Sequence, residues 1–97
     1  MRYEFDWDPA KAAGNIAKHG VSFEDAMSEF LDPLALSRPD DGSGFDEERW
    51  ITIGQSIDMK VLLVVQTYVE ISDALAVIRI ISARRPTKHE IRQYEEG

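Results

Sequence analysis

The chain opens with alternating apolar and acidic residues and then changes to helical spacing. Residues 3–7, Tyr-Glu-Phe-Asp-Trp, have the period of two that is typical of a half-buried strand. Asp8 can cap a following helix, and Pro9 suits its first position because no hydrogen bond is lost there. The helix should end at His19-Gly20, where glycine can take the left-handed conformation.

A second helix is predicted to begin at Ser22, with Asp25 three residues later as the acidic half of a capping box. Asp32-Pro33 should end this helix, and residues 34–39 read as a short strand. Five apolar side chains at helical spacing are expected to face the core: Phe23, Ala26, Met27, Phe30 and Leu31.

The second half of the chain reads mostly as sheet. Strands are predicted over residues 49–57, 60–69 and 76–83, and their short connections favour an antiparallel meander. Residues 61–65 are apolar on both faces, which is typical of a central strand. Thr87 and Glu90 form a capping box for a final helix to residue 96, with Ile91 and Tyr94 toward the sheet.

The predicted order is therefore β-α-α-β-β-β-β-α. This order indicates an α+β fold in which helices pack on an antiparallel β-sheet. A length of 97 residues, without internal repeats or a linker, predicts one domain spanning residues 1–97.

Composition narrows the class of protein. A formal net charge of −7 argues against non-specific binding of nucleic acid over the whole surface. The sequence has no cysteine, which excludes disulfides, thiol nucleophiles and Cys-ligated zinc. Its apolar runs are too short to span a bilayer, and its first residues are too acidic for a secretory signal. We therefore expect a soluble, cytoplasmic protein without a membrane partner.

Basic residues gather in one short segment of this acidic chain. Five of the eleven Lys and Arg residues lie between positions 79 and 92, with one acid among them: Arg79, Arg84, Arg85, Lys88 and Arg92. The segment runs from a strand through Pro86 into the capped helix. Guanidinium groups match phosphate oxygens well, so the corner predicts an anion site and favours phosphate.

Metal-independent cleavage of a phosphate ester needs a base for the attacking hydroxyl, an acid for the leaving oxygen and cations for the developing charge. Arg79 should project from the middle of its strand. Simple alternation places Arg84 on the opposite face, so strand twist and the corner before Pro86 would have to turn Arg84 toward the face of Arg79. The alternatives are a buried ion pair of Arg79 with Glu48 or Glu70, and a solvated pair of Arg84 and Arg85.

Other residues also have two interpretations. Histidine titrates near neutral pH, so His19 can transfer protons, but in a last helical turn it can also simply complement the helix dipole. Glu48 and Arg49 form either an acid–base pair or a strand-edge ion pair. Trp7 can stack on a base or belong to the core. Two histidines without a paired ligand spacing do not predict a zinc site, and no cofactor is expected.

Taken together, the residues resemble the BrnT family, the toxins of bacterial BrnT/BrnA type II toxin–antitoxin pairs. The resemblance covers nearly the whole chain in order and spacing. It rests on Phe5, Trp7-Asp8, Lys11, Asn15, Lys18-His19-Gly20-Val21, Phe23, Ala26, Phe30, Asp32, Glu47-Glu48-Arg49, Gly54, Leu63-Val64-Val65, Thr67, Ile78-Arg79-Ile80-Ile81-Ser82-Ala83-Arg84, Glu90 and Tyr94. Where the family commonly has Gly-Arg before its third long strand, this chain has Met59-Lys60, which keeps the charge but loses the bidentate fork.

The resemblance implies a RelE-like fold and an endoribonuclease that cleaves RNA and inhibits translation. It also implies neutralisation by a BrnA-like antitoxin in a 2:2 complex, with operator DNA bound only through the antitoxin. On this basis the expected catalytic residues are Arg79, Arg84, Lys60, Glu48 and His19. The expected RNA-binding residues are Arg49, Arg85, Lys88, Lys11 and Trp7.

Two other classes of function remain compatible with the sequence. One is a non-catalytic module whose basic patch binds an acidic peptide, or whose sheet edge accepts a partner strand. The other is an obligate subunit that is stable only in its complex. Growth arrest and RNA degradation on expression without a partner would distinguish the ribonuclease from both.

Overall fold

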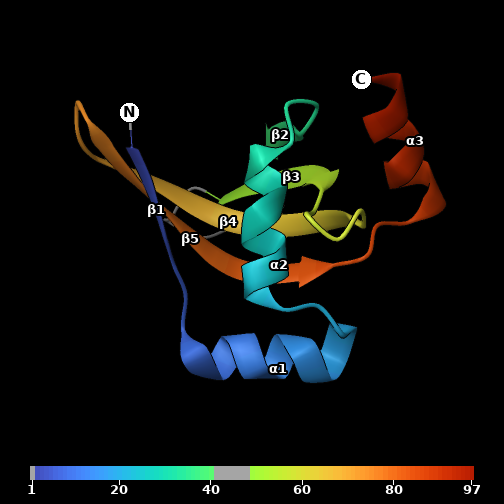
Figure 1. The fold of residues 1–97 in the computed structure, drawn as a ribbon, viewed down its shortest axis with the longest axis horizontal. Coiled ribbons are helices and arrows are strands. Elements are labelled where there is room, and N and C mark those ends of the chain that lie inside the picture. Colours follow the sequence, from blue (N-terminus) through green and yellow to red (C-terminus); the bar gives the residue numbers. More distant parts are fainter. Residues whose placement is uncertain (1, 41–48) are drawn as a thin grey trace.

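A computed structural model of the chain describes residues 2–40 and 49–97 (Figure 1). Its elements are β1 (Arg2–Asp6), α1 (Pro9–His19), α2 (Phe23–Ser28), the 3-10 helix η1 (Glu29–Leu31), β2 (Leu36–Pro39), β3 (Arg49–Gln55), β4 (Val61–Ser72), β5 (Leu75–Arg84) and α3 (Lys88–Glu96). The predicted α+β class and element order are confirmed.

The five described strands form one sheet in the order β1-β5-β4-β3-β2. Strands β2 to β5 pair antiparallel, as the short connections predicted. The first strand differs, because β1 lies parallel to β5 with Arg2 opposite Leu75 and Asp6 opposite Arg79. The sheet is therefore mixed, and its β1 edge is built from residues at opposite ends of the sequence.

The helix caps follow the sequence closely in two of three cases. The Asp8 side chain accepts a hydrogen bond from the Ala10 amide at 2.8 Å, and Gly20 ends α1 in the left-handed conformation with φ 70°. Thr87 and Glu90 form both halves of a capping box. At α2, Ser22 accepts from the Asp25 amide, but no bond from the Ser22 amide to the Asp25 carboxylate is found in the described residues.

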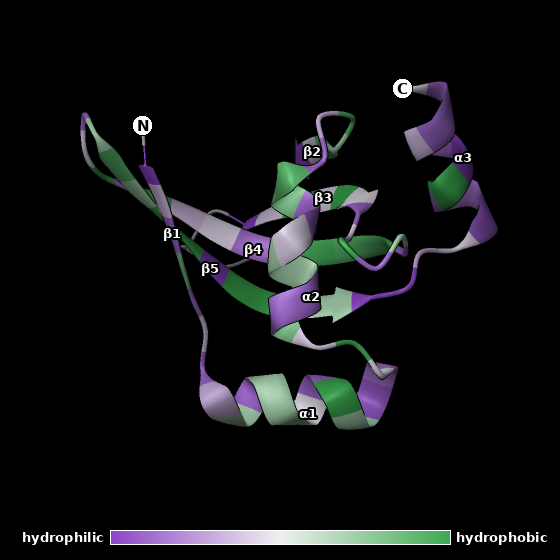
Figure 2. Ribbon diagram, viewed as in Figure 1, coloured by the Kyte–Doolittle hydropathy of each residue, from purple (hydrophilic) through white to green (hydrophobic). Residues whose placement is uncertain are grey.

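The main core lies between the sheet and the first two helices. Phe23 and Ala26 of α2 pack with Val21 against strand residues that point to the same side of the sheet: Leu62, Val64, Ile80 and Ala83. Figure 2 shows the apolar stretches of β4 and β5 running beneath α2. Met27 and Phe30 contact this core as expected, whereas Leu31 does not: its side chain is 82% exposed.

A β-bulge in β5 changes which side chains share a face. Gln66 of β4 pairs with Ile80 but the preceding Val65 pairs with Ser82, so Ile81 is the extra residue. The bulge reverses the alternation, and consequently Arg79 and Arg84 lie on the same side of the sheet. Simple alternation along the sequence had placed them on opposite sides. The bulge puts them on the same side, not strand twist or the corner before Pro86.

The last helix attaches to the other side of the sheet by polar contacts. Arg84 donates two hydrogen bonds to the Glu90 carboxylate, at 2.9 and 3.0 Å. The Tyr94 hydroxyl donates to Asp32 at 2.5 Å, which joins α3 to the segment after η1. Ile91 and Tyr94 are half-buried as predicted, and the rest of α3 is largely hydrophilic (Figure 2).

A carboxylic acid is buried where η1 crosses β3. Glu29 is 0% exposed, and in the described residues neither of its carboxyl oxygens has a partner with hydrogen-bond geometry. Burial raises its pKa to about 10, with a smaller opposing contribution from the Gly54 amide. Gly54 permits this close crossing, because a Cβ there would lie 3.0 Å from the Ala35 Cβ and 3.3 Å from the Glu29 carbonyl oxygen.

Candidate functional site

The two arginines that the sequence favoured most are both neutralised by acids of the same chain. Arg79 forms an ion pair with Asp6 at 3.1 Å, and about half of each side chain is exposed. The expected partners were different: Glu70 is not paired with Arg79, and Glu48 lies outside the described residues. Arg84 is paired with Glu90, and this pair raises the pKa of Arg84 and lowers that of Glu90 to about 2. Both arginines are therefore ion-paired within the chain in this conformation.

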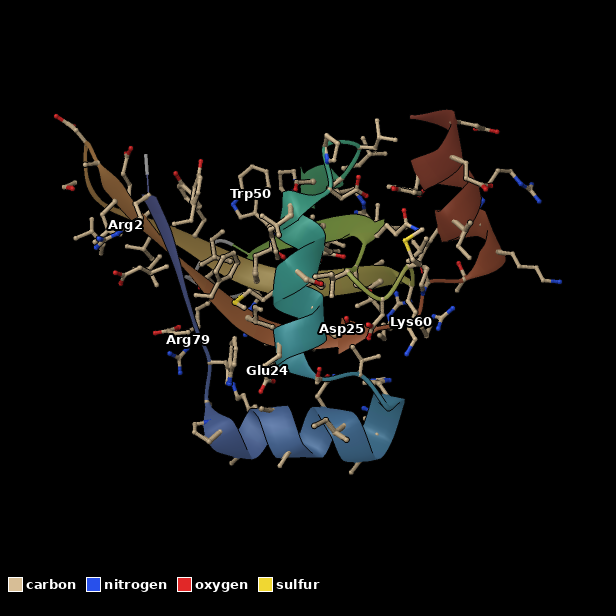
Figure 3. The ribbon with its side chains drawn as sticks, in the orientation of Figure 1. Arg2, Glu24, Asp25, Trp50, Lys60 and Arg79 are labelled. Carbon is tan, nitrogen blue, oxygen red and sulfur yellow. The ribbon has the colours of Figure 1, made fainter. Side chains whose placement is uncertain are left out.

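Other basic candidates converge on a small cavity at the end of the sheet. His19, Lys60 and Arg85 line a cavity of about 280 Å³ together with the carboxylates of Asp25 and Asp58. Figure 3 shows Asp25 and Lys60 beside each other where α2 meets the ends of the strands, whereas Arg79 lies well away from them. We call this the corner cavity. It combines one imidazole, two cations and two carboxylates from four separate segments.

The first wall of the corner cavity is the end of α1. Gly20 reverses the chain after His19, so that Val21 can enter the core and Ser22 can begin α2. Buried Asn15 holds α1 in place, because its amide group donates to the carbonyls of Val21 and Ala83 and its oxygen accepts from the Ala83 amide. Since Ala83 lies two residues before Arg85, these bonds of Asn15 hold the end of α1, which carries His19, in place relative to Arg85.

The second wall is the tight connection between β3 and β4, which the sequence placed at Asp58-Met59. The Met59 amide donates to the Ser56 carbonyl at 3.0 Å, and the Ser56 amide donates to the Lys60 carbonyl at 2.8 Å. Met59 itself has φ 66°, the left-handed conformation that normally favours glycine. The backbone therefore adopts a turn that would suit the Gly-Arg pair of the family pattern. Lys60 takes the position of the arginine in that pair.

The ionisable side chains of the corner cavity are not paired with each other. Within residues 2–40 and 49–97, no ion pair or hydrogen bond engages the side chains of His19, Lys60 or Arg85. One oxygen of Asp25, Oδ1, is buried there without a hydrogen-bond partner. This contrasts with Arg79 and Arg84, and it leaves the charges of the cavity available to a ligand.

The remaining sequence candidates lie elsewhere. Trp7 is half-buried and packs edge-to-face on Phe23 with ring centroids 5.9 Å apart, which supports its core interpretation. Lys11 and Lys88 are exposed on α1 and α3 and do not line the corner cavity. Arg49 is half-buried on β3, opposite Thr67. Glu48 belongs to residues 41–48, which the structure does not describe.

Sequence reasoning missed the functional potential of Asp25 and Asn15. Asp25 was read only as a helix-capping acid, because the pattern from Ser22 to Asp25 is the standard signal for a capping box. Asn15 was placed within the first helix and among the residues of the family resemblance, but no contact was assigned to it. A polar residue between Ala12 and Ile16 was a signal for its burial, but its partner Ala83 lies 68 positions away.

A second, apolar hollow lies between α2 and the β1 side of the sheet. Its volume is about 1180 Å³, and it is lined mainly by apolar and aromatic side chains, including Tyr3, Phe5, Met27, Trp50 and Tyr68. Tyr3 and Tyr68 are 52% and 44% exposed, and their rings pack against each other at 6.4 Å. We call this the apolar groove. An apolar surface of this kind is typical of a protein-binding site.

Among residues 2–40 and 49–97, no three His, Cys, Asp or Glu side chains lie together so as to hold a metal ion. In the same residues no helix has the length and apolar character needed to cross a membrane. The corner cavity has the groups that acid–base chemistry on an anion requires: proton-transfer groups beside fixed positive charge.

Both the sequence and the fold match known proteins of one family. The family model for the ribonuclease toxin BrnT of type II toxin–antitoxin systems matches residues 7–90. The fold is similar to the crystal structure of the Brucella abortus ribonuclease toxin BrnT, with a TM-score of 0.67 and 26% sequence identity over 90% of this chain and 100% of that chain. No curated protein matches the sequence. The chain therefore belongs to the BrnT family of ribonuclease toxins of type II toxin–antitoxin systems.

Proposed function

We propose that this toxin is an endoribonuclease that cleaves RNA in the corner cavity without a metal ion and thereby inhibits translation in the cytoplasm. The observation that carries the proposal is the convergence of His19, Lys60 and Arg85 on one cavity, with their side chains unpaired in the described residues. These residues come from positions far apart in the sequence. Their meeting is a property of the fold.

In this proposal the ribose 2′-hydroxyl attacks the adjacent phosphorus and the 5′-oxygen leaves. Lys60 and Arg85 bind the non-bridging phosphate oxygens, where negative charge grows in the transition state. His19 takes part in proton transfer, since imidazole exchanges protons readily near neutral pH. The expected products carry a 2′,3′-cyclic phosphate and a 5′-hydroxyl.

Purified toxin and an end-labelled single-stranded RNA, incubated in the presence of EDTA, test this proposal. We expect cleavage, and we expect a 2′-deoxy nucleotide at the cleaved position to abolish it. His19→Gln and Lys60→Ala should each lower the rate by about 100-fold or more. Lys60→Arg should retain activity, because it restores the commoner family residue.

Matched controls separate chemistry from general charge. Lys18→Ala removes a cation from the exposed face of α1, outside the corner cavity, and should leave the cleavage rate within about twofold. Equal losses for Lys18→Ala and Lys60→Ala would show that only overall charge matters. Activity that disappears with EDTA and returns with a divalent cation would exclude the metal-independent mechanism.

Membership of a type II toxin family implies an antitoxin partner. We propose that this partner is BrnA-like, that it buries the apolar groove while placing acidic residues near Lys88, and that the complex contains two copies of each chain. The exposed rings of Tyr3 and Tyr68 support a protein contact there. Light scattering of the co-purified complex should give the 2:2 mass, and Tyr68→Asp should weaken the complex while leaving free toxin active.

A further inference from the structure

We propose that Asp25 is a second catalytic group of the corner cavity, the base that accepts the proton of the ribose 2′-hydroxyl. The proposal rests on the function proposed above and assigns the two proton transfers to different residues. His19 then acts as the acid that protonates the leaving 5′-oxygen. Such a division suits in-line displacement, in which the attacking and leaving oxygens lie on opposite sides of phosphorus.

The first support is the unused hydrogen-bonding capacity of Asp25. An acid at this position of a helix normally accepts a bond from the capping residue's amide, as Glu90 does from the Thr87 amide at 2.8 Å. Asp25 does not do so in the described residues, although its Oδ1 is buried without a partner. The Asp25 carboxylate is therefore not used in the cap, and Asp25 lines the corner cavity instead.

The second support is that the Asp25 backbone is fixed on both sides. Its amide donates to the Ser22 hydroxyl at 3.0 Å, and its carbonyl accepts from the Ser28 hydroxyl at 2.6 Å. The adjoining Ala26 is fully buried in the core. Asp25 therefore lines the cavity from a backbone that is held in place, which a proton-transfer group needs.

The third support is the set of groups that face Asp25. His19 comes from α1, Lys60 and Asp58 come from the connection before β4, and Arg85 follows β5. The two cations attract a phosphate to the cavity that Asp25 lines, so base and substrate can share the site. Asp58 is a less suitable base, because it is exposed on the tight connection rather than fixed in a helix.

The atoms balance in a single displacement. Asp25 takes the proton from the 2′-hydroxyl as the O2′–P bond forms, and His19 gives a proton to the 5′-oxygen as the P–O5′ bond breaks. No oxidant, reductant or metal is consumed. After the step, Asp25 carries the extra proton and His19 has lost one. Exchange with solvent removes the proton from Asp25 and returns one to His19.

The test compares cleavage rates of the purified toxin between pH 4.5 and 9 for wild type, Asp25→Asn, Asp58→Asn and Asp73→Asn. Asp73 is exposed in the turn between β4 and β5 and provides the same chemical change away from the cavity. We expect Asp25→Asn to lower the rate by about 100-fold or more. It should also remove the fall in rate at acidic pH, which the other two variants should keep.

A substrate with sulfur in place of the 5′-oxygen separates the two proton transfers, because a thiolate leaves without being protonated. His19→Gln should recover to within about tenfold of wild type on this substrate, whereas Asp25→Asn should remain about 100-fold slower. Sulfur rescue of Asp25→Asn, or an unchanged acidic limb in that variant, would overturn the assignment, as would loss of the limb in Asp58→Asn. Far-UV circular dichroism and thermal melting confirm that each variant is folded. Absence of cleavage by the wild type would instead refute the proposed function.

Discussion

Replacing Glu29 with glutamine should stabilise this protein, and the gain should grow with pH. Burial raises the pKa of this carboxyl from its ordinary value of 4.5 to about 10. Between these two values the unfolded state is ionised while the folded state keeps the proton, so unfolding releases a proton and stability falls as pH rises. Glutamine has the shape of the protonated acid and does not titrate.

The magnitude follows from the pH interval. From pH 4.5 to 7 the wild type loses about 1.4 kcal/mol of unfolding free energy per pH unit through Glu29, or about 3 kcal/mol in all. At pH 5 the same reasoning gives less than about 1 kcal/mol. Glu29→Gln should therefore be more stable than wild type by up to about 3 kcal/mol at pH 7, and nearly equal to it at pH 5.

Urea unfolding followed by tryptophan fluorescence at pH 5, 6, 7 and 8 measures this difference. Glu24→Gln is the matched control, because Glu24 is exposed on α2 and should change stability by less than about 0.5 kcal/mol at every pH. Parallel stability curves for wild type and Glu29→Gln would refute the reasoning, since they would show that Glu29 is ionised in the folded state or that water reaches it.

Three other changes test separate parts of the structure. Glu90→Gln should cost about 1–2 kcal/mol at pH 7 and less than about half of that at pH 3. The pKa of Glu90 is lowered to about 2 by Arg84, so its contribution is fully present above its ordinary value of 4.5 and is lost as pH falls toward 2. Urea titrations at pH 7 and 3 measure this, and an equal cost at both would contradict the ion pair. Met59→Gly should raise stability by up to about 1 kcal/mol by relieving a φ of 66°, visible as a higher melting temperature. Asn15→Ala should cost about 3 kcal/mol, because it removes the partners of buried backbone groups at Ala83, and an unfolding midpoint unchanged from wild type would show that water replaces the amide.

Local signals in the sequence predicted the elements well because their causes are local. Ser22 and Thr87 cap helices through amides three residues away, and Gly20 ends a helix by its own conformation. The apolar patterns of residues 49–57, 60–69 and 76–83 predicted the three long strands for the same reason. The prediction that Leu31 faces the core was wrong. The chain changes from α-helical to 3-10 geometry in η1, and this change turns the Leu31 side chain to solvent.

The site could be predicted only in part because it depends on contacts between distant residues. His19 and Lys60 were each chosen for their chemistry, but no spacing indicates that they meet. The pairing of Arg79 with Asp6 follows from the parallel contact of β1 with β5, and the common face of Arg79 and Arg84 follows from a bulge at Ile81. Neither feature leaves a clear pattern in the residues around it.

The parallel pairing of β1 with β5 also sets the order in which the fold can form during synthesis. Arg2 pairs with Leu75, a separation of 73 positions, and the corner cavity needs both His19 and Arg85. Contacts between such distant residues form late, because the chain between them must be closed into a loop first. β1 therefore has no strand to pair with until β5 has been made, and the segment that follows β5 brings Arg85 to the cavity. A nascent chain that ends before β5 has neither the β1 edge of the sheet nor the complete corner cavity.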